Sequence, residues 1–357
     1  MKEPFLSRTE CTALRGIAIL GIILHNYCHW LRPAVKENEY LFKLSNSEAL
    51  WNAVSHPDWL LPVHLFSYFG HYGVPIFLFL SGYGLVLKYE RGQVVLPGKS
   101  TWRSALSFIG NHWLKLFKIM LPGFIAFVII DRITPNAWHY ETENIVALLT
   151  MVINIFPAPN TIIWPGPYWF FGLMLQLYVV YRLFFYRRHW AVAAIFVVLC
   201  WFLQVSCSPD GSSLNSLRYN CIGGMMPFCF GLLIARFNFH PTHRLNRSIY
   251  AIHFVAMILI IFLMCWSFQT WLWIPLFVIL CCYCLIKILP QSILKLLVWV
   301  GTISALIFVI HPIFRKIFIP LSHNGDVYAG AILYLLATIY VAWLSKIIGN
   351  KIHAPKQ

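Results

Sequence analysis

The chain has 357 residues, of which 59% are hydrophobic and only 11% are charged. A water-soluble domain of this length cannot bury so much apolar surface, so the composition excludes that class and predicts a membrane protein with several spans. The net charge of +15 does not indicate nucleic-acid binding, because the lysines and arginines lie in short segments between apolar runs, where membrane orientation explains them.

The apolar runs are long and continuous, which favours helices over the alternating strands of a membrane barrel. We predict an all-α polytopic fold, with about ten transmembrane helices in one integral membrane domain over residues 1–357. The predicted spans are residues 11–31, 68–88, 113–131, 168–186, 190–207, 221–238, 249–266, 271–289, 299–319 and 328–348. A shorter apolar run at 144–156 predicts an interfacial or re-entrant helix.

Ten spans place both termini on the same side of the membrane. Most lysines and arginines fall in the terminal segments and the even-numbered loops, whereas the odd-numbered loops hold most of the acids. This positive-inside bias predicts that both termini are cytoplasmic. Two long outer loops, residues 32–67 and 132–167, are rich in aromatic residues and are predicted to cover the outer face of a site.

The ten cysteines predict no metal site, because most lie inside apolar runs and none completes a zinc-ligand spacing. Thiols in such runs usually fill space in a hydrophobic core. Cys207 and Cys221 flank one loop, and the sequence leaves open whether they form a disulfide.

The first predicted span carries three ionisable side chains, which are costly in a membrane and usually mark a cavity or pathway. Arg15 lies near the cytoplasmic end, and His25 lies ten residues further on, about 15 Å deeper at the rise of a helix. Arg15 also fits snorkelling to the inner headgroups. His29 follows one turn later beside Trp30, where a role in the interfacial aromatic belt fits as well as a role in a site.

This combination suits the transfer of an acyl group from a phosphate-bearing donor. A guanidinium binds phosphate, and a neutral imidazole abstracts a proton from a hydroxyl or attacks an acyl carbon. Acyl-CoA has a charged nucleotide head and a long thin arm that ends in a thioester. We therefore predict that the head of acyl-CoA is held near Arg15 while its thioester reaches toward His25.

Five stretches resemble the acyltransferase-3 family of integral membrane acyltransferases. They are LRGIAILGIILH (14–25), GVPIFLFLSGYGL (73–85), KLFKIMLP (115–122), YWFFGLMLQLY (168–178) and GTISALIFVIHPIF (301–314). They follow the family order across nearly the whole chain. The resemblance implies a bacterial O-acetyltransferase in the inner membrane. Such an enzyme moves an acyl group, most often acetyl, from cytoplasmic acyl-CoA to a hydroxyl of an extracytoplasmic glycan or lipid-linked sugar, with no bound cofactor or metal.

The resemblance implies that His25 is the catalytic histidine, acting as a base or as a transient acyl carrier. Arg15, Lys115 and Lys118 are then expected to bind the phosphates of acyl-CoA, although the two lysines also fit charges that only orient the span. Further side chains are expected to line the site: Asn26, His29, Ser81, Tyr83, Trp169 and His311. Ser81 also fits close helix packing, Trp169 an aromatic belt, and His311 a polar contact between helices.

The chain departs from the family pattern at four points. Nine residues separate Arg15 from His25 instead of ten, and lysines stand before the third span where arginines are usual. Pro75 occupies a position that is often acidic, and no acid lies in the middle of a predicted span. The sequence therefore predicts no carboxylate within the membrane to orient His25.

Two other functions remain open from the sequence. A transporter of a glycan or lipid-linked sugar would share the aromatic outer loops and cationic spans, but the sequence shows no pair of inverted halves. A receptor or scaffold with a degenerate site is the third alternative. The sequence does not fix the acceptor, the acyl chain, the choice between direct transfer and an acyl-enzyme, or the oligomeric state.

Overall fold

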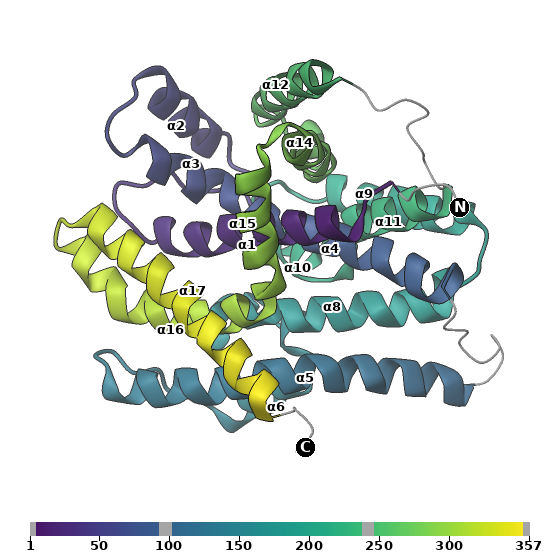
Figure 1. The fold of residues 1–357 in the computed structure, drawn as a ribbon, viewed down its shortest axis with the longest axis horizontal. Helices are drawn as coiled ribbons and strands as arrows, with labels where there is room; N and C mark the ends of the chain where they lie inside the picture. The colour runs from purple at the N-terminus through teal and green to yellow at the C-terminus, as the bar shows by residue number, and fades with distance from the viewer. Residues whose placement is uncertain (1–4, 93–101, 238–245, 353–357) are drawn as a thin grey trace.

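The computed structural model describes residues 5–92, 102–237 and 246–352, and within these ranges the regular structure is helical throughout (Figure 1). The longer helices are α1 (Arg8–Cys28), α2 (Leu44–Ser55), α3 (Leu61–Phe69), α4 (Gly73–Leu85), α5 (Trp102–Ile133), α8 (Trp169–Val180), α9 (Trp190–Val205), α11 (Cys221–Phe237), α12 (Arg247–Met264), α14 (Ile274–Ile288), α15 (Gln291–Thr302), α16 (Ser304–His323) and α17 (Val327–Ile352). Shorter helical segments are η1 (Gly70–Tyr72), η2 (Val86–Glu90), α6 (Thr142–Leu149), η3 (Ile153–Ile155), α7 (Pro159–Ile162), η4 (Gly166–Tyr168), η5 (Tyr181–Phe185), α10 (Ser212–Tyr219) and α13 (Phe268–Trp271).

Among the described residues, 7 helices are long and apolar enough to cross a membrane, which confirms an all-helical membrane protein. These candidates are Arg8–Cys28, Leu61–Glu90, Trp102–Ile133, Gly166–Phe185, Arg247–Met264, Ser304–His323 and Val327–Asn350. The other three predicted spans coincide with the pair α10 and α11, which is bent by 44°, and with α9 and α14, which are shorter. The count of ten and the cytoplasmic position of the termini therefore stay predictions.

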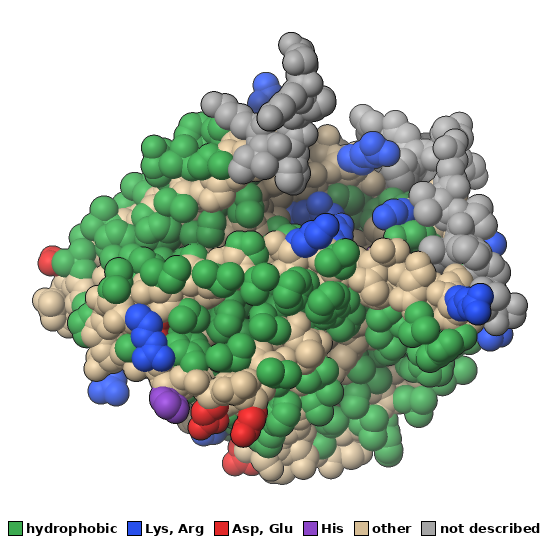
Figure 2. Space-filling model, turned by 90° about the horizontal axis from the view of Figure 1, so that it is seen from below, with side chains coloured by type: hydrophobic (Ala, Val, Ile, Leu, Met, Phe, Trp, Pro, Cys, Tyr) green, Lys and Arg blue, Asp and Glu red, His purple; other side chains and the backbone are tan. Residues whose placement is uncertain are grey.

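The molecular surface carries its apolar side chains where lipid would contact them. Helix α12 exposes Ile252 and Leu263, and α9 exposes Val198 and Phe202, each by more than half of its surface. Figure 2 shows a face covered mostly by hydrophobic side chains, with most Lys and Arg toward one end and Asp and Glu toward the other. An apolar band between polar ends is the arrangement that a bilayer stabilises.

Helix α1 begins at a reciprocal capping box. The backbone N–H of Ser7 donates to the Glu10 carboxylate at 2.8 Å, and the Glu10 N–H donates to the Ser7 hydroxyl at 3.2 Å. Two N–H groups that the first turn cannot satisfy are thereby paired. Helix α1 then runs through the middle of the molecule and packs against α3, α4, α15 and α16, which buries its catalytic candidate in the centre (Figure 1).

Helices α4 and α11 pack together through two glycines. A β-carbon on Gly82 would clash with the backbone carbonyl of Phe228, and one on Gly231 would clash with the carbonyl of Phe79. Small residues allow membrane helices to approach this closely, and the packing interpretation of the Ser81–Gly82 pair therefore holds for Gly82.

We expect Gly82→Ala to destabilise the protein by about 1–3 kcal/mol, because the backbone of α11 has to move. Gly84 lies on the same helix with no atom near its added β-carbon, so Gly84→Ala is the matched control and should be neutral or slightly stabilising. Thermal unfolding of both variants in nanodiscs measures the difference. Equal stability of the two would contradict the close contact.

Both long loops predicted to lie outside the membrane carry helices. Residues 32–67 contain α2 and most of α3, and residues 132–167 contain α6, η3 and α7. The short apolar run at 144–156 divides between α6 and η3, while its position relative to a membrane stays a prediction. The predicted ninth span is divided at Ile303, where α15 ends and α16 begins. Cys207 and Cys221 are free thiols.

Candidate functional site

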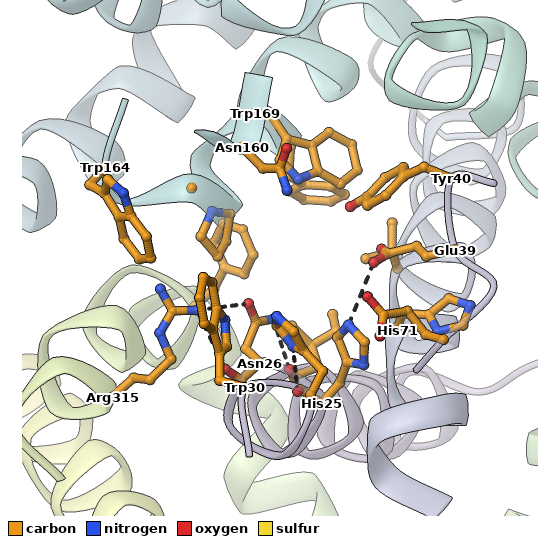
Figure 3. Close-up of a pocket in the computed structure, with 18 residues that line it drawn as sticks. His25, Asn26, Trp30, Glu39, Tyr40, His71, Asn160, Trp164, Trp169 and Arg315 are labelled. Carbon is orange, nitrogen blue, oxygen red and sulfur yellow. Dashed lines mark hydrogen bonds and ion pairs between the residues drawn. The ribbon is translucent and has the colours of Figure 1, made fainter. Parts of the chain in front are cut away.

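Two cavities lie along α1, one toward each end of the helix. A cavity of about 130 Å³ lies beside the last turns of α1 and is drawn in Figure 3; we call it the outer cavity because the sequence predicts that this end of α1 faces outward. Its polar lining residues are His25, Asn26, His29, Glu37, Glu39, Tyr40, His71, Asn160 and Arg315, and its large aromatic ones are Trp30, Trp164, Trp169, Phe170 and Phe308. It therefore combines ionisable groups with flat apolar faces.

The imidazole of His25 is buried at the wall of the outer cavity, with 4% of its surface exposed. Its Nδ1 lies 2.9 Å from the backbone carbonyl oxygen of Ser67. Because a carbonyl only accepts hydrogen bonds, Nδ1 carries a proton and Nε2 is the atom left for proton transfer. Nε2 lies 3.5 Å from a carboxylate oxygen of Glu39. This exceeds the 2.7–2.9 Å typical of a charge-assisted hydrogen bond, so Glu39 contacts Nε2 without a short hydrogen bond to it.

A glycine brings the segment before α4 against His25. A β-carbon on Gly70 would lie 2.7 Å from the β-carbon of His25, so only glycine fits at this contact. The same close approach places the Ser67 carbonyl on Nδ1 and sets the ring of His71 5.4 Å from that of His25. His29 stacks on the ring of His25 with the two centroids 4.7 Å apart, and its Nδ1–H donates to the His25 carbonyl.

The carboxylate beside His25 comes from a loop outside the spans, which the sequence did not predict. Two hydrogen bonds fix the part of the loop that precedes Glu39: Ser67 Oγ donates to the Val35 carbonyl at 2.6 Å, and Trp271 Nε1 donates to the Asn38 carbonyl at 2.9 Å. Arg218 Nε donates to the carbonyl of Glu39 itself at 3.0 Å. An extended loop that packs over the end of α1 therefore supplies the acid that the spans lack.

The two glutamates of this loop respond differently to burial. Burial is the largest single influence on the pKa of Glu39 and raises it, but the contacts with His25, His71 and Tyr40 together hold that pKa below the ordinary value. Burial raises the pKa of Glu37, and the charge of His25 offsets this only in part. Glu39 is consequently ionised at neutral pH, whereas Glu37 gains a proton more readily.

His25, Glu37 and Glu39 offer ligand atoms that lie within 4.8 Å of one another. Such a set of one imidazole and two carboxylates has the chemistry to hold a divalent cation. The contact between His25 and Glu39 accounts for the same arrangement without a metal, and no step below depends on one.

The inner cavity, of about 250 Å³, lies toward the start of α1 and is enclosed by α1, α4, α5, α8 and α16. Arg15 and Lys115 supply its two cationic side chains, and Ser81, Tyr178 and Ser304 supply hydroxyls. The rest of the lining is apolar, including Phe77, Leu80 and Met174. An apolar cavity whose lining includes two cations suits a ligand with an anionic head and a thin arm.

The two cavities share four apolar lining residues: Ile22, Val74, Phe170 and Phe308. We call this set the apolar collar. His25 lies one turn beyond Ile22 on α1, on the outer side of the collar. The imidazole therefore lies in the part of the outer cavity that is next to the lining residues shared with the inner one.

The other residues expected at the site divide between the cavities and the core. Asn26, His29 and Trp169 line the outer cavity, and Ser81 lines the inner one. Lys118 is exposed on α5 but is not among the residues that line the inner cavity, because a three-residue step turns it about 60° from Lys115 around the helix.

Two further residues expected at the site line neither cavity and make structural contacts instead. The backbone N–H of Leu6 donates to the Tyr83 hydroxyl at 3.0 Å, which ties the start of the chain to α4. His311 is fully buried in α16, and its Nδ1–H donates to the Phe308 carbonyl at 2.7 Å. Proline at the next position leaves local carbonyls without their usual helical partner, which explains why the ring turns back onto its own helix.

Comparison with protein families identifies the chain. The family model for the acyltransferase domain of type 3 matches residues 10–347. The chain belongs to the acyltransferase-3 family. No curated protein and no solved structure matches the chain. The resemblance drawn from the five stretches is thereby confirmed, and this acyltransferase is a membrane enzyme that acts on an acceptor substrate.

Proposed function

We propose that this acyltransferase moves an acyl group, in the simplest case acetyl, from cytoplasmic acyl-CoA to a hydroxyl of an extracytoplasmic glycan or lipid-linked sugar. One observation carries the proposal: the His25–Glu39 pair lies directly beyond the apolar collar, which lies between a cationic cavity and a polar, aromatic one. A cationic cavity on one side of the imidazole and a polar, aromatic cavity on the other suit a donor that comes from one face of the membrane and an acceptor that comes from the other.

The inner cavity suits the donor. Arg15 and Lys115 would bind the phosphates of acyl-CoA, and the apolar lining would hold its arm. Arg15 and His25 are ten residues apart, which turns them about 80° from each other around α1 but separates them by about 15 Å along it. The shared collar supports the idea that both address one donor molecule in spite of this rotation.

The outer cavity suits the acceptor and the chemical step. The acceptor hydroxyl gives its proton to His25 Nε2 as its oxygen attacks the thioester carbonyl, and the carbon–sulfur bond then breaks. The departing sulfur takes the proton from the imidazolium, so the products are the ester and free CoA. The ionised Glu39 stabilises the imidazolium between these events, which favours a general base over an acyl-histidine.

We expect Arg15→Ala to raise the KM for acetyl-CoA by about tenfold or more, because a charged hydrogen bond to a donor phosphate contributes about 1.5–3 kcal/mol. Steady-state kinetics of purified protein measure this change. Arg8 is exposed near the start of the same helix and does not line the inner cavity, so Arg8→Ala is the matched control. Equal KM values for the two variants would contradict the donor site.

Mass spectrometry of surface glycans from cells with and without the gene tests the function as a whole. The proposal predicts that a glycan loses the mass of one acetyl group, or of another acyl group, when the gene is removed. Identical glycan and lipid-linked sugar profiles in the two strains would contradict it.

A further inference from the structure

Arg315 is a buried cation that the proposed step at His25 does not use. It lies on α16, lines the outer cavity and exposes only 5% of its surface. No sequence pattern singled it out, because it follows the stretch that resembles the ninth span of the family. A buried guanidinium is costly unless its charge is compensated, so the groups around Arg315 indicate whether its role is structural or ligand binding.

The polar partners of Arg315 are weak. Its Nη1 lies 3.4 Å from the backbone oxygen of Asn26 and 3.5 Å from the side-chain oxygen of the same residue. Within residues 5–92, 102–237 and 246–352, no carboxylate lies at ion-pair distance from it, and no hydrogen bond engages its Nε or Nη2. The next residue, Lys316, does have a carboxylate partner, Asp131.

Two indole rings hold the guanidinium in place. Its central carbon lies 5.5 Å from the ring centroid of Trp30 and 4.9 Å from that of Trp164. Cation–π contacts stabilise the charge and fix the orientation of the group, but they accept none of its N–H bonds. The planar guanidinium of Arg315 therefore faces the cavity with most of its N–H donors free to bind a ligand.

The positively and negatively charged side chains of the outer cavity lie on opposite sides of it. Figure 3 shows Arg315 and Trp164 on one side and Glu39 and Tyr40 on the other, with His25 below the space between them. Glu39 is in contact with His25, and Glu37 belongs to the same cluster, so neither neutralises Arg315. An acceptor that spans the cavity thus meets a cation at one end and the proton-transfer pair at the other.

We propose that Arg315, held between Trp30 and Trp164, binds an anionic group of the acceptor, which makes the natural acceptor an acidic sugar. The anion is either the carboxylate of a sugar acid or the phosphate of a lipid-linked sugar, since both match the guanidinium fork. The indole faces beside it pack against sugar C–H groups. This inference rests on the proposed function and adds the charge of the acceptor to it.

Saturation-transfer NMR with the protein in nanodiscs tests this inference without catalysis. The probes are methyl glucoside, methyl glucuronide and glucose 1-phosphate, which differ in charge on one sugar scaffold. We expect at least one acidic probe to bind about tenfold or more tightly than methyl glucoside, the factor expected from a charge-assisted hydrogen bond. The probe that gains identifies carboxylate or phosphate as the source.

Two variants complete the test. Arg315→Gln should abolish the preference for the acidic probe, and Arg315→Lys should keep part of it as a point charge. Arg132 is exposed at the end of α5, so Arg132→Gln is the control and should keep the full preference. Equal binding of all three probes to the wild type, or a preference that survives in Arg315→Gln, would overturn the inference. Charge-selective binding that depends on Arg315, in a protein that shows no acetyl transfer, would support an anion site at Arg315 and contradict the proposed function.

Discussion

Replacing His25 by alanine is expected to lower acyl transfer by about 10²–10⁴-fold, the usual contribution of a general base. The loss should appear in kcat, because the ring meets the reacting hydroxyl and the donor head lies at the other end of α1. Purified protein in nanodiscs, supplied with radiolabelled acetyl-CoA and glycan extracted from cells that lack the gene, gives the rate.

The control for this variant lies on the exposed surface of the helix bundle, away from both cavities. His253 is exposed on α12 and lines neither cavity, so His253→Ala should keep the wild-type rate. His25→Gln removes the base with less change in volume and separates chemistry from packing. Wild-type turnover by folded His25→Gln would exclude the imidazole as the base.

Replacing Glu39 by glutamine is expected to slow transfer by about 10–100-fold. The carboxylate lies 3.5 Å from Nε2 and stabilises the imidazolium by its charge, an attraction of about 1–4 kcal/mol at this range. Because the pKa of Glu39 lies below its ordinary value, the Glu39 carboxylate is ionised throughout the neutral range. Its contribution to the rate is lost only as the pH falls through the lowered pKa. The deficit of the variant should therefore be constant across the neutral range.

Rates measured at several pH values test this prediction. Glu48 is exposed on α2 in the same outer loop, so Glu48→Gln should behave as the wild type at every pH. A Glu39→Gln enzyme with normal kcat would mean that the loop only covers the site.

The sequence was sufficient for features that depend on local pattern. Apolar runs predicted the membrane class, and each predicted span falls on helical structure, although the ninth is divided at Ile303 and three others fall on bent or shorter helices. The order of the five stretches predicted the family. His25 stood out because an imidazole deep in an apolar helix is costly, which holds whatever packs around it.

The sequence was insufficient where long-range packing places a side chain. Glu39 lies in a loop that was predicted only to cover the site, and it reaches His25 because Gly70 and the Ser67–Val35 hydrogen bond bring the loop down onto α1. The two acids that closely follow the first span were the available signal.

Arg315 depends on still more distant contacts. Its neighbours Trp30 and Trp164 come from the end of α1 and from the second outer loop, so their approach is a property of the tertiary fold. Span assignment treated such a cation as an orientation charge. An arginine about one helical turn from the end of a predicted span, three residues after Pro312, was the weaker signal that a cavity lay there.

A sided transfer assay tests the central claim most directly. The wild-type protein is reconstituted in sealed vesicles. Radiolabelled acetyl-CoA is confined to the side of the membrane on which Arg15 and Lys115 lie, and the extracted glycan is confined to the opposite side. The account predicts label on the glycan in this arrangement and none with His25→Gln. Label that reaches the glycan only when donor and glycan share one compartment would contradict transfer at an imidazole between the two cavities.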